Sequence, residues 1–284
     1  MAGLPAQGYT SNSARTVAEV KVAVENIRDT AAQMPGGTAR EELTISGGAI
    51  VPPDGSGGGW FRVDTEGNAA TDDLASITTT NCWDGMLVWL GAENTGRVVT
   101  IKHGTGNISL EDGTDLDLTD LEMWVELQLR SSTWVEVKRH YKRIAFEATP
   151  ASDQGSVGSG SWTNVAFATE AYDDGSAFST PSFTAPYAGE YLFTWVVGSV
   201  TSFADQEQTE TRLYKNGTTV VGGTRDRASG STRCVHNGSR VIRLARGDTV
   251  TVQFLQSSGS SATLDGDGSS TGIPMHFAGR FLRG

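Results

Sequence analysis

Phe183-Thr-Ala-Pro-Tyr-Ala-Gly-Glu-Tyr-Leu-Phe193 decides the fold of this chain, because a turn rich in Pro and Gly leads directly into an aromatic strand. The strand continues through Thr194-Trp-Val-Val197. Side chains alternate between the two faces of a strand. One face carries Tyr191, Phe193, Trp195 and Val197, and the other carries Leu192, Thr194 and Val196.

Both faces of this strand are therefore largely apolar. An antiparallel sandwich needs only one face of each strand for its own core, so a second apolar face requires another partner. Another copy of the chain is the simplest partner, and a second sheet edge or a loop is the alternative. We expect Tyr191, Phe193 and Trp195 to lie at a trimer interface.

Two turns follow this strand. Asn216-Gly217 separates two short alternating runs, which predicts a type I′ hairpin whose two central residues both have positive φ. Arg246-Gly-Asp248 separates Val241–Leu244 from Thr249–Leu255, and we expect these two runs to be antiparallel neighbours.

The order of these motifs resembles the jelly-roll head of the complement and tumour-necrosis-factor-like superfamily. The residues that carry the resemblance are Phe178, Phe183–Phe193, Leu213-Tyr-Lys-Asn-Gly217, Arg243–Val250 and Phe277-Ala-Gly-Arg-Phe-Leu282. The resemblance implies a trimeric head, residues 142–284, that binds a partner and does not catalyse. It also implies that the first and last strands pair, with Ile144 and Phe146 beside the strand of Phe277 and Phe281. Residues 153–161 have linker composition, but we interpret them as a loop of this head.

The N-terminal residues predict a helix from about Ser13 to Gln33, ended by Pro35-Gly36-Gly37. Apolar residues alternate at spacings of three and four, which is the pattern of a coiled-coil seam. The seam residues expected at a trimer interface are Val17, Val20, Val24 and Ile27. The alternative is an amphipathic helix that packs on a globular domain. We interpret residues 1–38 as a helical anchoring arm.

Residues 39–141 predict a second β-rich unit, because short alternating runs are separated by Gly and Asp turns. Its landmarks are Asp72-Asp-Leu-Ala-Ser-Ile77, Arg97-Val-Val-Thr-Ile-Lys-His-Gly104 and Trp134-Val-Glu-Val-Lys-Arg139. Together they resemble a module of tail and fibre proteins of tailed bacteriophages. The expected fold class is mainly β: an α-helical arm that could form a trimeric coiled coil, a middle antiparallel β module and a C-terminal jelly-roll sandwich.

Composition excludes several functions. The 284 residues include 33 Asp and Glu against 22 Lys and Arg, a net charge of −11, which argues against a nucleic-acid partner. We expect no membrane insertion and no secretory signal, since no apolar run is long enough for either. Cys82 and Cys234 fall in different predicted units and suggest neither a disulfide framework nor a zinc site.

Candidate chemistry is sparse, and we expect no enzyme activity, cofactor or metal. Paired acids occur at Asp72/Asp73, Asp173/Asp174 and Asp265/Asp267, in turns where Asp is favoured for local hydrogen bonds. Asp265-Gly-Asp267 could offer oxygen ligands to calcium, but the twelve-residue calcium-loop pattern is missing. The four His residues show no hydrolytic triad pattern.

The sequence hypothesis is a structural virion protein of a tailed bacteriophage, assembled in the bacterial cytoplasm as a homotrimeric tail fibre or receptor-binding adhesin. Its arm would attach to other tail or capsid proteins, and its head would contact host surface glycan or protein. Candidate ligand-binding residues on the head are Trp162, Tyr172, Arg225, Arg227 and Asp265. The alternatives are a head fibre or capsid decoration protein and, less favoured, a tailspike glycan depolymerase.

Overall fold

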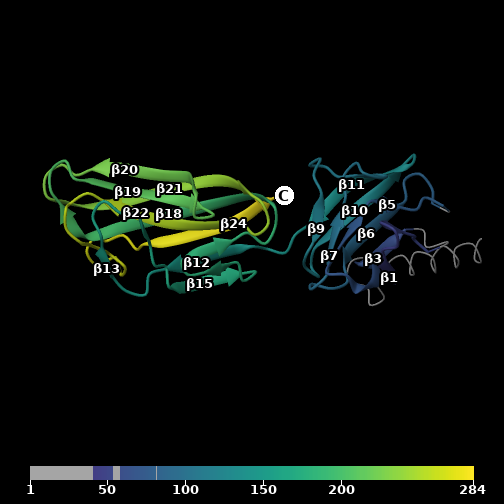
Figure 1. Ribbon diagram of the computed structural model, residues 1–284, viewed down its shortest axis with the longest axis horizontal. Coiled ribbons are helices and arrows are strands. Elements are labelled where there is room, and N and C mark those ends of the chain that lie inside the picture. The colour runs from purple at the N-terminus through teal and green to yellow at the C-terminus, as the bar shows by residue number, and fades with distance from the viewer. Residues whose placement is uncertain (1–40, 54–57, 81) are drawn as a thin grey trace, which may run out of the picture. The chain divides into compact units, whose positions relative to one another are not determined.

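The computed structural model describes residues 41–53, 58–80 and 82–284, and the chain divides into two compact units between Tyr141 and Lys142 (Figure 1). Regular structure in these residues is almost entirely β, apart from one 3₁₀ turn, η1 (Glu66–Asn68). No helix among the described residues is long and apolar enough to cross a bilayer. The predicted arm, with Val17, Val20, Val24 and Ile27, lies outside the described residues.

In its described residues, the N-terminal unit contains eleven short strands in three sheets. The longest sheet has the order β1-β3-β6-β10-β11-β8, and the smaller sheets are β2-β5 and β4-β7-β9. The strands are β1 (Glu41–Thr44), β2 (Ala49–Ile50), β3 (Gly59–Asp64), β4 (Thr71–Leu74), β5 (Ser76–Ile77), β6 (Leu87–Ala92), β7 (Val98–Ile101), β8 (Ile108–Ser109), β9 (Leu116–Leu118), β10 (Trp124–Arg130) and β11 (Thr133–His140).

The unit is β-rich, as predicted, but parallel pairing dominates its first part, so the expected antiparallel arrangement holds only for the pairs β6–β10, β10–β11 and β7–β9. β3 pairs in parallel with β1 and β6, β2 with β5, and β4 with β7. Three of these pairs, β2–β5, β3–β6 and β4–β7, have partners about 27 to 29 residues apart, so the chain winds as a short coil of stacked turns. The alternation of apolar residues is the same in parallel and antiparallel strands. The Gly and Asp turns that suggested hairpins are corners of this coil.

Strands β9 to β11 close the coil by reversing direction. β10 lies antiparallel to both β6 and β11, and β9 lies antiparallel to β7. Strands β6, β10 and β11 contribute buried side chains to the core of this unit, namely Val88, Leu90, Val125, Leu127 and Trp134. The indole N–H of Trp134 donates to the carbonyl of Ile77, which ties the closing strands to the coil.

The C-terminal unit contains two sheets. The β18 sheet has the order β13-β23-β18-β24-β12-β15, with β21 also on β18, and the β22 sheet has the order β16-β17-β22-β19-β20, with β14 also on β22. The strands are β12 (Ala145–Thr149), β13 (Gln154–Val157), β14 (Thr163–Asn164), β15 (Thr169–Asp174), β16 (Phe178–Ser179), β17 (Ser182–Thr184), β18 (Gly189–Phe203), β19 (Gln208–Lys215), β20 (Thr219–Arg227), β21 (Thr232–Leu244), β22 (Thr249–Gln256), β23 (Ala262–Leu264) and β24 (His276–Arg283).

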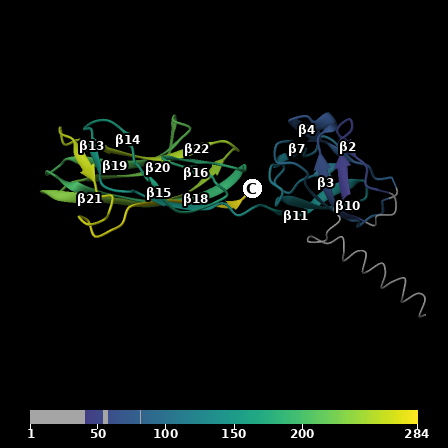
Figure 2. The ribbon, with the colours of Figure 1, turned by 90° about the horizontal axis from the view of Figure 1, so that it is seen from below.

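These sheets form the two layers of a jelly roll, seen edge-on in Figure 2. The chain changes sheet between β17 and β18, and changes again on either side of the β19–β20 hairpin. β12 pairs with β24, which places Phe146 opposite Gly279, and the carbonyl of Ile144 accepts from Phe281 N. The predicted pairing of first and last strands is confirmed.

One turn prediction is confirmed and one is wrong. Asn216 and Gly217 have φ of 53° and 62°, and Thr218 N donates to the Lys215 carbonyl, as a type I′ turn between β19 and β20 requires. The runs on either side of Arg246-Gly-Asp248 are β21 and β22, which belong to different sheets. A Gly-Asp turn reverses the chain equally well within one sheet or between two, so the sequence did not distinguish these cases.

The head core is an aromatic cluster centred on Phe146. Its ring lies 4.9 to 5.2 Å, centroid to centroid, from the rings of Phe178, Phe183 and Phe277. Gly279 packs against the rings of Phe146 and Phe193. A Cβ added there would lie 2.6 Å from Phe146 Cε1 and 2.8 Å from Phe193 Cδ1. The close approach of a strand to two rings explains the glycine.

We predict that Gly279→Ala lowers the free energy of unfolding by about 1–3 kcal/mol, because the added methyl overpacks the aromatic cluster. Gly155→Ala is the control, since that strand glycine has no atom within 4 Å of an added Cβ. Urea unfolding of both variants measures the difference. Equal stability of the two variants would contradict the packing described.

A chain of side-chain hydrogen bonds joins strands β18, β19, β20 and β21. The Trp195 indole donates to Thr211 Oγ1 (3.0 Å), which lies 2.7 Å from Thr224 Oγ1. Thr224 Oγ1 lies 2.9 Å from His236 Nδ1, and His236 Nε2 lies 2.9 Å from Thr209 Oγ1. An indole can only donate, so Thr211 Oγ1 accepts from Trp195, whereas either partner can be the donor in the other three bonds. A neutral imidazole can use both ring nitrogens in this chain, one as the donor and one as the acceptor.

We predict that the head loses stability below about pH 6.5, the ordinary pKa of His. Burial lowers the pKa of His236, although Asp226 and Glu210 oppose this. The unfolded chain therefore binds the proton first, and stability falls as the pH drops from the unfolded towards the folded pKa. Urea midpoints between pH 7.5 and 5.5 should fall less for His236→Gln than for the wild type. Parallel profiles would show that His236 does not titrate in this range.

Candidate functional site

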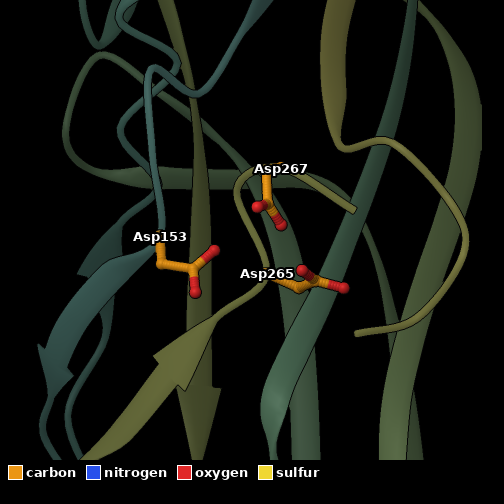
Figure 3. Close-up of side chains that lie close together, drawn as sticks. All are labelled: Asp153, Asp265 and Asp267. Atoms are coloured by element: carbon orange, nitrogen blue, oxygen red, sulfur yellow. The ribbon is translucent and has the colours of Figure 1, made fainter. Parts of the chain in front are cut away.

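Three acids gather at one end of the head. Asp153 precedes β13, and Asp265 and Asp267 follow β23 (Figure 3). In Figure 1, β13 lies at the end of the head opposite the C-terminus. Gly266 lets the two segments approach, because a Cβ there would collide with the backbone of Ser152. One carboxylate oxygen of each acid lies within 4.8 Å of the others.

Backbone amides surround this acid cluster. Gly266 N donates to Asp153 (2.8 Å), Ser269 N donates to Asp267 (2.8 Å), and Ser270 N and Thr271 N donate to Asp265. Hydrogen bonds from Ser269 hold the pKa of Asp267 below its usual range. Asp265 is fully buried.

The acid cluster has the chemistry for a hard cation such as calcium, which prefers carboxylate and carbonyl oxygens. The amides already offset part of its negative charge, so the arrangement is also stable as a loop anchor. The sequence pointed to Asp265 and Asp267, but it gave no signal for Asp153, because the two segments are far apart in the chain.

A second array lies on the outer face of the β22 sheet. The Arg212 guanidinium carbon is 4.0 Å from the ring centroids of both Trp162 and Tyr214. Arg212 Nε donates to Gln253 Oε1 (2.8 Å), and Gln253 Nε2 donates to Asn164 Oδ1 (2.7 Å). We call these five residues the arginine array. A cation between two aromatic faces is held by electrostatic attraction as well as packing.

The predicted ligand residues are distributed over several faces. Trp162 belongs to the arginine array, and Arg225 on the neighbouring strand β20 pairs with Glu210 (2.8 Å). Arg227 ends β20 and is exposed, whereas Tyr172 lies on β15 of the β18 sheet. Asp265 is buried and bonded to amides, so it is not available to a surface ligand.

The candidate ligand residues chosen from the sequence did not include Arg212, Tyr214 and Gln253. Their period-two positions on β19 and β22 were visible in the sequence. The pairing of β14 with β22, which brings Trp162 towards them, was not visible.

The expected interface residues of β18 need a correction. Tyr191 and Phe193 are 0% exposed and Trp195 is 2% exposed within a single copy, so they belong to the core of the sandwich. Leu192, Thr194 and Val196, on the opposite face, are the half-buried residues. The sequence showed two apolar faces but did not indicate which one faced the chain's own core.

The N-terminal unit offers a surface cavity of about 410 Å³ beside β8 and β11. Its buried acid, Glu136, is paired with Arg139 and accepts from the backbone N–H of Glu111. Arg139 also pairs with Asp112 (3.1 Å). The buried charges of this cavity are therefore already matched.

Residues 145–273, which lie within the C-terminal unit, match the family description "C1q domain". No curated protein matches the chain. Solved structures similar to the chain include the globular domain of zebrafish complement 1qA, with 20% identity, 49% of this chain and 98% of that chain covered, and a TM-score of 0.37. Murine APRIL at pH 5.0 has 14% identity and a TM-score of 0.38, and the match covers 50% of this chain and 100% of that chain. Eiger TNF from S. frugiperda has 10% identity and a TM-score of 0.37, and the match covers 50% of this chain and 94% of that chain.

We predict that Asp265→Asn lowers the free energy of unfolding by about 1–3 kcal/mol, because the new amide group would face backbone N–H donors in a buried site. Asp226→Asn, at an exposed position of β20, is the control. Thermal unfolding with and without calcium chloride adds a second readout. A cation held by the acid cluster would raise the wild-type midpoint more than that of Asp265→Asn. Unchanged stability of Asp265→Asn would contradict the anchoring role.

Proposed function

We propose that the chain is a non-catalytic, homotrimeric binding protein of a tailed bacteriophage particle, a tail fibre or receptor-binding adhesin. The C1q domain match of residues 145–273 supports a binding head. The stacked coil of the N-terminal unit supports a structural module. The bacteriophage assignment comes from the sequence resemblance of residues 39–141, and with it we propose a virion location after assembly in the bacterial cytoplasm.

The observation that carries the trimer proposal is the outer face of the β18 sheet. Across its middle, Leu192 lies between Val241 and Arg280, and Thr194 lies between Ser239 and Ala278. Apart from the exposed Arg280, these side chains are small or apolar, and Val241 is 49% exposed. Leu282, farther along β24, is 41% exposed. A surface of this composition favours burial against copies of itself.

Three heads on one particle protein would convert weak individual contacts into durable attachment, because the second and third contacts are intramolecular. A head fibre or capsid decoration protein would use the same head and interface, but it would attach to the shell. Position on the particle distinguishes these two roles.

We predict that the native protein has three times the 30.1 kDa chain mass by light scattering. Val241→Glu should reduce this to the mass of one chain, because it places a charge in the proposed interface. Val220→Glu is the matched control: Val220 is 55% exposed on β20 of the other sheet, and its variant should remain trimeric. A monomeric wild type, or dissociation by Val220→Glu alone, would overturn the proposal.

A further inference from the structure

Arg212 is a charged side chain held in place before any ligand arrives. Its guanidinium lies between the rings of Trp162 and Tyr214, and its Nε is fixed by Gln253. Asn164 in turn fixes the Gln253 amide. The residue is half-buried. Most of the rotamer entropy that a flexible Arg loses on binding has therefore already been lost in the free protein.

The charge of Arg212 is not balanced by a carboxylate. Its neighbours are matched: Arg225 pairs with Glu210 at 2.8 Å, and Lys215 pairs with Asp248 at 2.6 Å. Within the described part of the chain, no acid lies in salt-bridge distance of Arg212, although the protein carries 33 Asp and Glu. Its terminal nitrogens make no hydrogen bond with the described residues. A fixed guanidinium fork with unused donors on an acidic protein favours an anionic ligand.

The chemistry around the fork narrows the class of anion. A planar guanidinium binds a carboxylate through two parallel hydrogen bonds. Trp162 and Tyr214 supply apolar faces beside it, and the Asn164 and Gln253 amides can exchange hydrogen bonds with hydroxyl groups. The array spreads across strands β14, β22 and β19 of one sheet face.

From this arrangement we propose that the arginine array binds a carboxylate-bearing saccharide, with the Arg212 guanidinium donating two hydrogen bonds to the carboxylate. The inference rests on the proposed function, since it names the ligand class of the head. Successive carboxylates along one polysaccharide would be available to three copies of the array in a trimer, which would raise avidity.

The test is calorimetric titration of the 284-residue protein with an oligomer of galacturonic acid. The fully methyl-esterified oligomer is the ligand control, because it keeps the sugar rings and loses the carboxylates. We expect the acid oligomer to bind and the ester to bind at least about tenfold more weakly, which corresponds to about 1.4 kcal/mol.

Two substitutions of equal charge change form the protein control. Arg212→Gln should weaken binding at least about tenfold, whereas Arg225→Gln, on the neighbouring strand but already paired, should change it less than about twofold. Arg212→Lys keeps the charge without the fork and should also weaken binding. Urea unfolding and light scattering of each variant show whether fold and assembly are retained.

Several results would overturn the inference: no binding of the acid oligomer, equal binding of the ester, equal losses in Arg212→Gln and Arg225→Gln, or wild-type affinity in Arg212→Lys. Failure of the proposed function looks different. A trimeric wild type that attaches to bacterial cells, with attachment retained in Arg212→Gln, would keep the adhesin and reject this ligand site. A monomeric wild type that still binds the acid oligomer through Arg212 would reject the trimer and keep the site.

Discussion

The head depends on the pairing of β12 with β24 and of β24 with β18. This three-strand arrangement joins the first strand of the unit to the last, and it places Phe146 among rings from both sheets. Burial of aromatic side chains supplies most of the driving force for such a sandwich. Because the inner faces of both sheets are committed to this core, the proposed binding and assembly of the head would use its outer faces and loops.

Local patterns predicted the head well and the N-terminal unit partly. The Asn216-Gly217 turn needs positive φ at two adjacent residues, so a hairpin there could be predicted from local chemistry alone. The sheet change at Arg246-Gly-Asp248 and the parallel coil could not, because they depend on which distant strands meet. Alternation reports that a strand has two faces but does not identify the neighbour that each face contacts.

The candidate sites show the same difference between local sequence patterns and contacts that only the fold creates. Asp265 and Asp267 are neighbours in sequence, but Asp153 joins them only through the fold. Trp162 was a reasonable candidate as an aromatic residue in a loop, yet its meaning changes once Arg212 is found against its ring. Tyr191 and Phe193 were placed at an interface because both strand faces are apolar, and only the second sheet shows that these rings face inward.

Hydrogen exchange of the 284-residue protein, followed by mass spectrometry of its peptides, tests the central claim most directly. If the β12–β24–β18 arrangement holds the head together, peptides from these three strands exchange slowest and at a common rate, because their amides open only in global unfolding. Exchange of β12 that is much faster than that of β18 and β24 would contradict the account, since it would show that the first strand is peripheral to the fold.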